Sequence, residues 1–217
     1  MSTFLTADTH FGHQLMIRLP HLPRPFTSVD EMDNALISNW NNTVHPRDTV
    51  WHLGDFSMSH TPDRVAETFS QLNGIKRLIL GNHDVDKKGR PLPSLTALDW
   101  ASISHAAEIT HDGQRIVLSH YAPYVWNQAH RGAFCAFGHS HGTVQGLPGC
   151  IDVGVDAQRL RPISVSEFIL QAENSIINAP EIVDTITSRL LGLKTGWKQR
   201  ADAILEAREE AISPPKP

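Results

Sequence analysis

The stretch that decides the fold runs from Lys76 to Asp84 and reads Lys-Arg-Leu-Ile-Leu-Gly-Asn-His-Asp. Its first part, ending at Leu80, is a short apolar run closed by a glycine, which predicts a buried strand. An amide, an imidazole and a carboxylate then follow together at Asn82, His83 and Asp84. Open α/β sheets place their ligand crevice at the carboxyl ends of the strands, so we expect a site here. A polar turn is the alternative for these four residues taken alone.

The composition is that of an ordinary globular protein. The chain has 217 residues, 40% hydrophobic and 19% charged, which is enough for one sizeable domain with its own core. Its formal net charge of -4 gives no general basic surface for nucleic acid. Two cysteines, Cys135 and Cys150, argue against a disulfide scaffold and fit a reducing compartment. Because we find neither a signal-peptide pattern nor an apolar run of about 20 residues, we expect a cytoplasmic protein.

The first half of the chain alternates strands with helices. Short apolar runs predict strands at residues 3–7, 49–53 and 76–80. Ser28 and Glu31 form a capping box that begins one helix, and Pro62 takes the first position of a second helix ending near Leu72. This β-α-β-α-β order predicts a parallel sheet.

The second half predicts further strands. Asp112-Gly113 is a hairpin signal between the runs 107–110 and 114–118. Residues 132–137 form another apolar run, whereas 85–100 and 121–132 are polar and predict loops. Residues 151–155 and 163–170 predict a further strand and a closing element.

Thirteen histidines are unusual, and several of them stand at predicted strand ends beside carboxylates. Five strand ends in turn carry polar side chains that can bind metal, namely Asp8 and His10, Asp55, Asn82, His120, and His139 and His141. Side chains two residues apart on an extended segment point to the same face, which suits the two pairs. An isolated Asp-x-His in a loop would carry little weight, but five such ends in order indicate a metal site.

Seven ligands are too many for one zinc ion, which takes four. They suit two adjacent metals that share one carboxylate, and Asp55, which stands alone between the other clusters, is the natural bridge. Nitrogen and oxygen ligands without thiolates suit manganese, iron, zinc, nickel or cobalt, of which we favour manganese. Two such metals, about 3.5–4 Å apart, activate water and clamp the oxygens of a phosphoester during hydrolysis. His83 would then protonate the leaving group or stabilise developing charge, with Asp84 orienting its ring.

Taken together, these blocks resemble the calcineurin-like metallophosphoesterase superfamily, over roughly residues 3–156. The blocks are Asp8-x-His10, Gly54-Asp55, Gly81-Asn82-His83-Asp84, His120 and Gly138-His139-Ser140-His141. The stretches 8–13, 24–26 and 50–56 are similar to small bacterial and phage phosphoesterases of that superfamily. The resemblance implies a four-layer αββα sandwich with two central mixed β-sheets.

The resemblance also implies roles for single residues. Asp8, His10, Asp55 and His141 would hold one metal, and Asp55, Asn82, His120 and His139 the other. His83 takes the family's catalytic position.

Four further residues are candidates for substrate binding. Arg24, His130 and Arg131 could bind an anion, and His13 could touch the substrate phosphate. The alternative for each is an ordinary exposed side chain. For His52 we prefer a buried core histidine.

The predicted function is hydrolysis of a small phosphodiester, nucleotide-like or cyclic, because an alkoxide leaving group needs a proton. The alternatives are a phosphomonoesterase and a metal-binding scaffold of the same fold with little turnover. No basic stripe supports nucleic-acid processing, and no segment suggests a membrane partner.

We divide the chain into a phosphoesterase domain over residues 1–175 and a C-terminal extension over 176–217. Apolar stripes predict amphipathic helices at 180–191 and from Trp197 to Arg208, before a proline-rich end that we expect to be disordered. These helices could pack on the domain or join two copies into a homo-oligomer.

Overall fold

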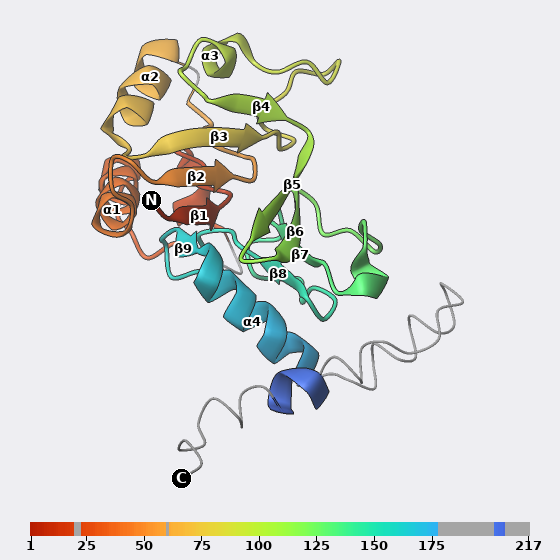
Figure 1. Ribbon diagram of the computed structural model, residues 1–217. Coiled ribbons are helices and arrows are strands. Elements are labelled where there is room, and N and C mark those ends of the chain that lie inside the picture. The colour runs from red at the N-terminus through yellow and green to blue at the C-terminus, as the bar shows by residue number, and fades with distance from the viewer. Residues whose placement is uncertain (20–22, 60, 178–201, 207–217) are drawn as a thin grey trace.

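The computed structural model describes residues 1–19, 23–59, 61–177 and 202–206 (Figure 1). Its first sheet has five strands, in the spatial order β4 (Ser102–Ser104), β3 (Ile75–Ile79), β2 (Thr49–His52), β1 (Thr3–Thr6) and β9 (Ile163–Ser164). β1 to β4 are parallel and β9 is antiparallel to β1. The parallel sheet expected from the β-α-β-α-β order is therefore confirmed.

The second sheet has four strands, in the order β5 (Ala106–His111), β6 (Gln114–Ser119), β7 (Phe134–Phe137) and β8 (Cys150–Asp152). β5 and β6 form the expected antiparallel hairpin around Asp112-Gly113, whereas β6, β7 and β8 are parallel. Both sheets are thus mixed.

Helices flank the sheets. They are α1 (Val29–Thr43), α2 (Pro62–Gln71), α3 (Pro93–Thr96) and α4 (Val165–Ile177), with short 3-10 helices η1 (Gln14–Ile17) and η2 (Ala129–Arg131). α4 packs against β1, β8 and β9. The fold class, two mixed sheets flanked by helices, is confirmed.

Two hydrophobic clusters follow from the alternation of side chains along β1. Phe4 points to the cluster that the first sheet shares with α1 and α2, which includes Met32, Trp40 and Phe69. The next residue, Leu5, points to the cluster shared with the second sheet and α4. The first sheet is therefore buried on both faces, and the edge where its parallel strands end is left for the site.

Local signals explain most element ends. The capping box is present, since the Ser28 hydroxyl accepts the backbone N–H of Glu31. The Glu31 carboxylate accepts chiefly from the backbone N–H and the hydroxyl of Thr27, one residue before the cap. The structure adds elements that the sequence did not predict. These are α3 within the expected 85–100 loop, β4 after it, η2 within the expected 121–132 loop, and η1. The closing element at 163–170 is the two-residue strand β9 followed directly by α4.

The C-terminal extension lies mostly outside the described residues. The expected helix at 180–191 and the proline-rich end fall there, while 202–206, inside the second expected helix, are helical. The division at residue 175 stays a prediction, and α4 continues two residues past it. Across the described ranges, none of the helices combines the length and apolar character that a membrane span needs, and the cytoplasmic location also stays a prediction.

Candidate metal centre

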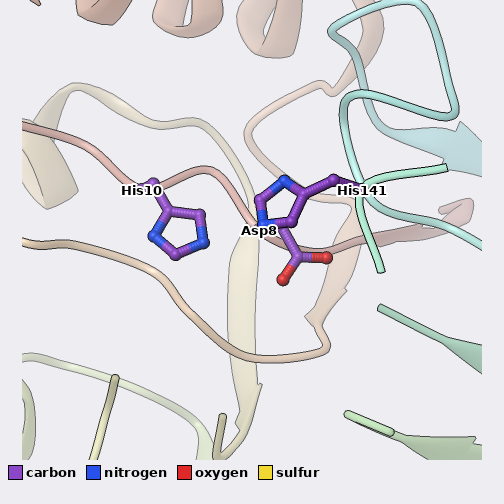
Figure 2. A group of neighbouring side chains, drawn as sticks. All are labelled: Asp8, His10 and His141. Atoms are coloured by element: carbon purple, nitrogen blue, oxygen red, sulfur yellow. The ribbon is translucent and has the colours of Figure 1, made fainter. Parts of the chain in front are cut away.

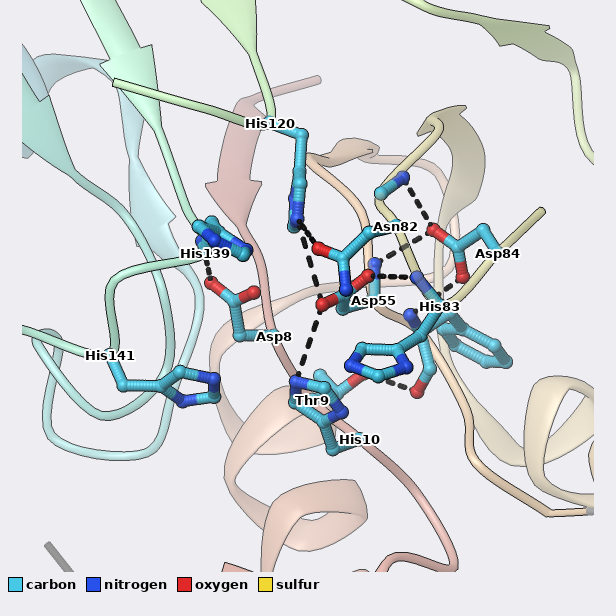
Figure 3. Close-up of polar contacts among 12 residues, drawn as sticks. Asp8, Thr9, His10, Asp55, Asn82, His83, Asp84, His120, His139 and His141 are labelled. Carbon is cyan, nitrogen blue, oxygen red and sulfur yellow. Dashed lines mark hydrogen bonds and ion pairs between the residues drawn. The ribbon is translucent and has the colours of Figure 1, made fainter. Parts of the chain in front are cut away.

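The seven expected ligands come together from the carboxyl ends of five strands. Asp8 and His10 follow β1, Asp55 follows β2, and Asn82 follows β3 in the first sheet. His120 follows β6, and His139 and His141 follow β7, in the second sheet. The side chains converge where the ends of the two sheets meet (Figure 3).

Six of the ligands form two groups of three. Asp8, His10 and His141 form the first group, in which one ligand atom of each residue lies within 4.8 Å of those of the other two (Figure 2). Asp55, His120 and His139 form the second group by the same criterion. We call these the Asp8 group and the Asp55 group.

The carboxylate of Asp55 lies between the two groups. Its Oδ2 is 3.5 Å from Nε2 of His10, which belongs to the Asp8 group, and 3.6 Å from Nε2 of His120. Its Oδ1 accepts the backbone N–H of His83 at 2.9 Å. Asn82 joins the Asp55 group, because its Oδ1 is 3.1 Å from His120 Nε2. The arrangement has the connectivity expected of two metals that share Asp55, although metal binding itself stays a prediction.

The electrostatics of the Asp8 group favour a cation. Burial, and secondarily the nearby Asp55 carboxylate, raise the pKa of Asp8 well above its usual value. Burial and the neighbouring His141 lower the pKa of His10, so that its ring is neutral. Asp8 Oδ1 and both ring nitrogens of His10 are buried and find no hydrogen-bond partner among the described residues. Buried ligand atoms of this kind are costly unless something binds them.

Backbone strain is concentrated in the same residues. Five of the seven expected ligands have a positive φ, namely Asp8 (57°), His10 (48°), Asp55 (58°), His139 (69°) and His141 (50°). This left-handed region is uncommon for residues other than glycine, and strained backbone tends to gather at functional sites.

One edge of the centre is open. Asp8, His10, Asp55 and His120 are buried, whereas Asn82 and His139 are exposed and His83 and His141 are partly exposed. A ligand can therefore approach from the side of Asn82 and His139.

The structure corrects the expected role of Asp84. Its carboxylate does not orient the ring of His83. Instead Oδ2 accepts the backbone N–H groups of Asp55 at 2.7 Å and Gly81 at 2.8 Å, and Oδ1 accepts that of Phe56 at 3.0 Å. The backbone segments that follow β2 and β3 present three buried N–H groups here that no described strand accepts. The buried carboxylate of Asp84 is the acceptor that satisfies them. Asp84 holds the segment that carries Asp55.

The structure also corrects Arg24, which is buried and does not offer its guanidinium to a substrate. Nε and Nη2 donate to the two carboxylate oxygens of Asp156, at 2.8 and 2.9 Å. Nη1 and Nη2 also donate to the backbone carbonyls of Thr9 and Asp8. Asp156 in turn accepts from Nδ1 of His141 at 2.6 Å. Sequence reasoning missed Asp156, although Asp152-Val153-Gly154-Val155-Asp156 repeats the pattern of a carboxylate after a strand.

Two histidines border the Asp8 group. The ring of His83 lies 5.3 Å from that of His10 between centroids, and His13 lies 5.3 Å from His10 and 6.3 Å from His83. Burial and the proximity of His83 lower the pKa of His13, which favours the neutral ring. The structure thus brings His13 and His83 to the expected site.

The remaining candidates lie elsewhere. His130 and Arg131 are exposed on η2, and their role in substrate binding stays a prediction. His52 is fully buried on β2, as preferred. Its Nε2 lies 2.9 Å from the hydroxyl of Thr9, and the hydroxyl donates to the carbonyl of Phe56.

Comparison with known proteins identifies relatives. No protein-family model matches the chain. The Gene 66 protein of Mycobacterium phage D29 is 30% identical over 182 residues, which cover 72% of this chain and 88% of the phage protein. The chain belongs to the same family as that Gene 66 protein. A second relative of this chain is the uncharacterized protein MJ1445 of Methanocaldococcus jannaschii, which is 44% identical to it over 82 residues. That match covers 37% of this chain and only 46% of the archaeal protein.

Solved structures are also similar. A protein of unknown function from Aquifex aeolicus, AQ665, matches with a TM-score of 0.61 and 26% identity, covering 78% of this chain and 98% of that one. The two chains share their fold over nearly all of the Aquifex protein. A novel archaeal phosphodiesterase matches with a TM-score of 0.40 and 20% identity, over 71% of this chain and 82% of that one.

Proposed function

We propose that this protein is a metal-dependent hydrolase of small phosphodiesters, of the calcineurin-like superfamily and its small bacterial and phage branch. The observation that carries the proposal is the place of Asp55. One carboxylate oxygen lies 3.5 Å from a histidine of the Asp8 group and 3.6 Å from a histidine of its own group. A carboxylate between two sets of nitrogen and oxygen ligands is what a pair of divalent metals needs.

The residues present fit two metals. Asp8, His10, Asp55 and His141 would hold one, and Asp55, Asn82, His120 and His139 the other. The buried, unpartnered atoms of Asp8 and His10 would gain a partner, and the repulsion between the Asp8 and Asp55 carboxylates would be relieved. The mixture of imidazole, carboxylate and amide ligands suits manganese, iron, zinc, nickel or cobalt, and we favour manganese.

When bound, the two metals supply Lewis acidity toward the phosphoryl oxygens and lower the pKa of water. The chain's own residues do the rest. His83, partly exposed beside His10, gives a proton to the leaving oxygen. His13, which lies beside His10 and His83, donates a ring N–H to the substrate phosphate. Asp84 fixes the backbone on either side of the centre through three N–H groups, so that Asp55 stays in place.

His83 supports hydrolysis of a phosphoester with a poor leaving group, and a small diester is the class that we propose. A phosphoester of an alcohol releases an alkoxide, which leaves slowly unless a donor protonates it. A histidine at the open edge of the centre is such a donor. The approach past Asn82 and His139 suits a small substrate, nucleotide-like or cyclic.

The test uses the full chain stripped of metal. Manganese, nickel, zinc, iron(II), cobalt or magnesium is added back, and hydrolysis of bis-p-nitrophenyl phosphate is compared with that of p-nitrophenyl phosphate. We expect metal-restored cleavage of the diester, which Asp55→Asn abolishes. His83→Ala should lower kcat by about 10²–10⁴-fold for a diester with an alkoxide leaving group, the usual contribution of a general acid, and by much less for the p-nitrophenyl esters, whose phenolate leaves without a proton.

The outcomes separate the possibilities. Preference for p-nitrophenyl phosphate would replace the diester with a phosphomonoester. Two bound metals without turnover of either compound would favour the scaffold. Full activity in Asp55→Asn would contradict the shared-carboxylate proposal altogether.

A further inference from the structure

A buried ion pair contacts the residues of the Asp8 group on the side away from the expected metals. Arg24 grips Asp156 with two parallel hydrogen bonds, and the side chains are only 1% and 6% exposed. Paired forks of this kind fix geometry as well as charge. We call the two residues the Arg24–Asp156 pair. Arg24 precedes α1 and Asp156 follows β8, so the pair joins segments 132 residues apart.

The pair contacts the segments that carry all three ligands of the Asp8 group. Asp156 Oδ2 accepts from Nδ1 of His141 at 2.6 Å, which puts the ring proton on Nδ1 and leaves Nε2 free to bind. On its other side, Arg24 donates to the carbonyls of Asp8 and Thr9, at 2.6 and 2.7 Å. Those peptides lie in the segment that bends through the left-handed residues Asp8 and His10.

The Asp55 group is supported differently. His120 donates its Nδ1 proton to a backbone carbonyl, that of Leu53, at 2.7 Å. Asp55 is held by the backbone N–H of His83. Within the described part of the chain, no hydrogen bond joins the Arg24–Asp156 pair to Asp55, His120 or His139.

We infer that the Arg24–Asp156 pair positions His141 and the Asp8–His10 segment, and so sets the metal affinity of the Asp8 group far more than that of the Asp55 group. The inference rests on the proposed function, since it assumes two metals. A carboxylate that accepts from a ligand histidine orients the ring and makes it a better donor, and its loss costs about 10–100-fold in affinity. Asp156 and Arg24 are therefore positioning residues, and the two metals differ in how they are held.

The test is titration of the metal-free full chain with Mn²⁺ by calorimetry. We expect two ions in the wild type. Asp156→Asn should keep one tight ion and weaken the other by about 10–100-fold. Asp48→Asn is the matched control, since Asp48 is a buried carboxylate that accepts backbone N–H groups of Ser2 and His45, before β2 and away from the centre. It should bind two ions as the wild type does.

A second pair of variants identifies the weakened site. His139→Ala removes a ligand of the Asp55 group and should leave one tight ion. His139→Ala combined with Asp156→Asn should leave no tightly bound ion. Arg24→Lys keeps a buried positive charge but cannot form the fork, so it should weaken the same site as Asp156→Asn. It also serves if Asp156→Asn fails to fold.

Two results would overturn the inference. The first is wild-type affinity at both sites in Asp156→Asn or Arg24→Lys, and the second is equal weakening of both sites. The zinc-loaded wild type gives a test that needs no variant to fold. Its imidazole ¹⁵N spectrum should show His141 with the proton on Nδ1, and a proton on Nε2 would rule out the pair's role. Fewer than two bound ions in the wild type would instead count against the proposed function.

Discussion

Gly81→Ala should disable the centre by displacing its shared carboxylate. A Cβ at this position would lie 2.2 Å from Asp55 Oδ1, 2.6 Å from the backbone N of Asp55 and 2.8 Å from His120 Cε1. Ordinary contact begins at 3.4 Å, so the carboxylate oxygen must move by about 1.2 Å and the backbone of Asp55 must shift with it. It cannot move freely, because it accepts the backbone N–H of His83. A misplacement of about 1 Å costs about 10²-fold in rate, or about 2.7 kcal/mol of transition-state stabilisation.

The assay compares kcat/KM for bis-p-nitrophenyl phosphate with Mn²⁺ affinity and thermal stability. We expect Gly81→Ala to lose about 10²-fold in kcat/KM, to bind Mn²⁺ more weakly, and to lose about 1–3 kcal/mol of stability through overpacking. Gly113→Ala is the matched control. A Cβ at Gly113 would meet nothing within 4 Å. Because Gly113 has a positive φ, Gly113→Ala should destabilise the β5–β6 turn without affecting the centre. Wild-type kcat/KM and Mn²⁺ affinity in Gly81→Ala would show that the reasoning is wrong.

Three further outcomes are expected. Chelation should lower the stability of the loaded protein by about 2.7 kcal/mol for each site that was held at 100 times its Kd, and an unchanged Tm in EDTA would contradict metal binding. Burial lowers the pKa of His52 from 6.5 to about 3, so the unfolded chain binds more protons than the folded one between these values. Stability of the metal-free protein should therefore fall as the pH drops from 6.5 to 3, by about 5 kcal/mol from this residue, and His52→Gln should flatten that slope in urea unfolding. Ser28→Ala should cost about 1 kcal/mol through loss of the α1 cap and leave Mn²⁺ affinity unchanged, as titration of the folded variant would show.

The positions of the expected metal ligands could be predicted from the sequence, because each follows a local pattern of an apolar run and a strand end. Asp55 and Asn82 follow apolar runs closed by Gly54 and Gly81, and the ends of parallel strands meet at one edge of a sheet. His139 and His141 repeat the pattern after β7. The period of the sequence and the topology of the sheet therefore suffice to bring these residues together.

The contacts that support the expected ligands, made by Arg24, Asp156 and Asp84, could not be predicted from such local patterns. The sequence predicts for Arg24 either an anion-binding or an ordinary exposed side chain. Its partner Asp156 lies 132 residues away, and no local pattern indicates an ion pair of that separation. From the sequence, Asp84 is predicted to orient the ring of its neighbour His83. Instead it satisfies peptide groups that only the bend after β2 leaves without partners. Such roles depend on tertiary structure and not on spacing.

The start of α4 shows a second limit. Residues 163–170 are apolar enough to be buried in either conformation, and a short apolar run does not distinguish a strand from a buried helix. The chain in fact uses both, with β9 pairing beside β1 before α4 covers the sheet edges.

The left-handed residues of the centre have a consequence for evolution in the laboratory. His139 is exposed and has a φ of 69°, a conformation that glycine adopts without penalty and that costs other residues about 1–2 kcal/mol. A library selected only for survival on heating, in the absence of metal, should therefore enrich glycine or asparagine at this position. Selection for turnover should restore histidine. The left-handed backbone at residue 139 thus makes one residue type best for thermal stability and another best for activity.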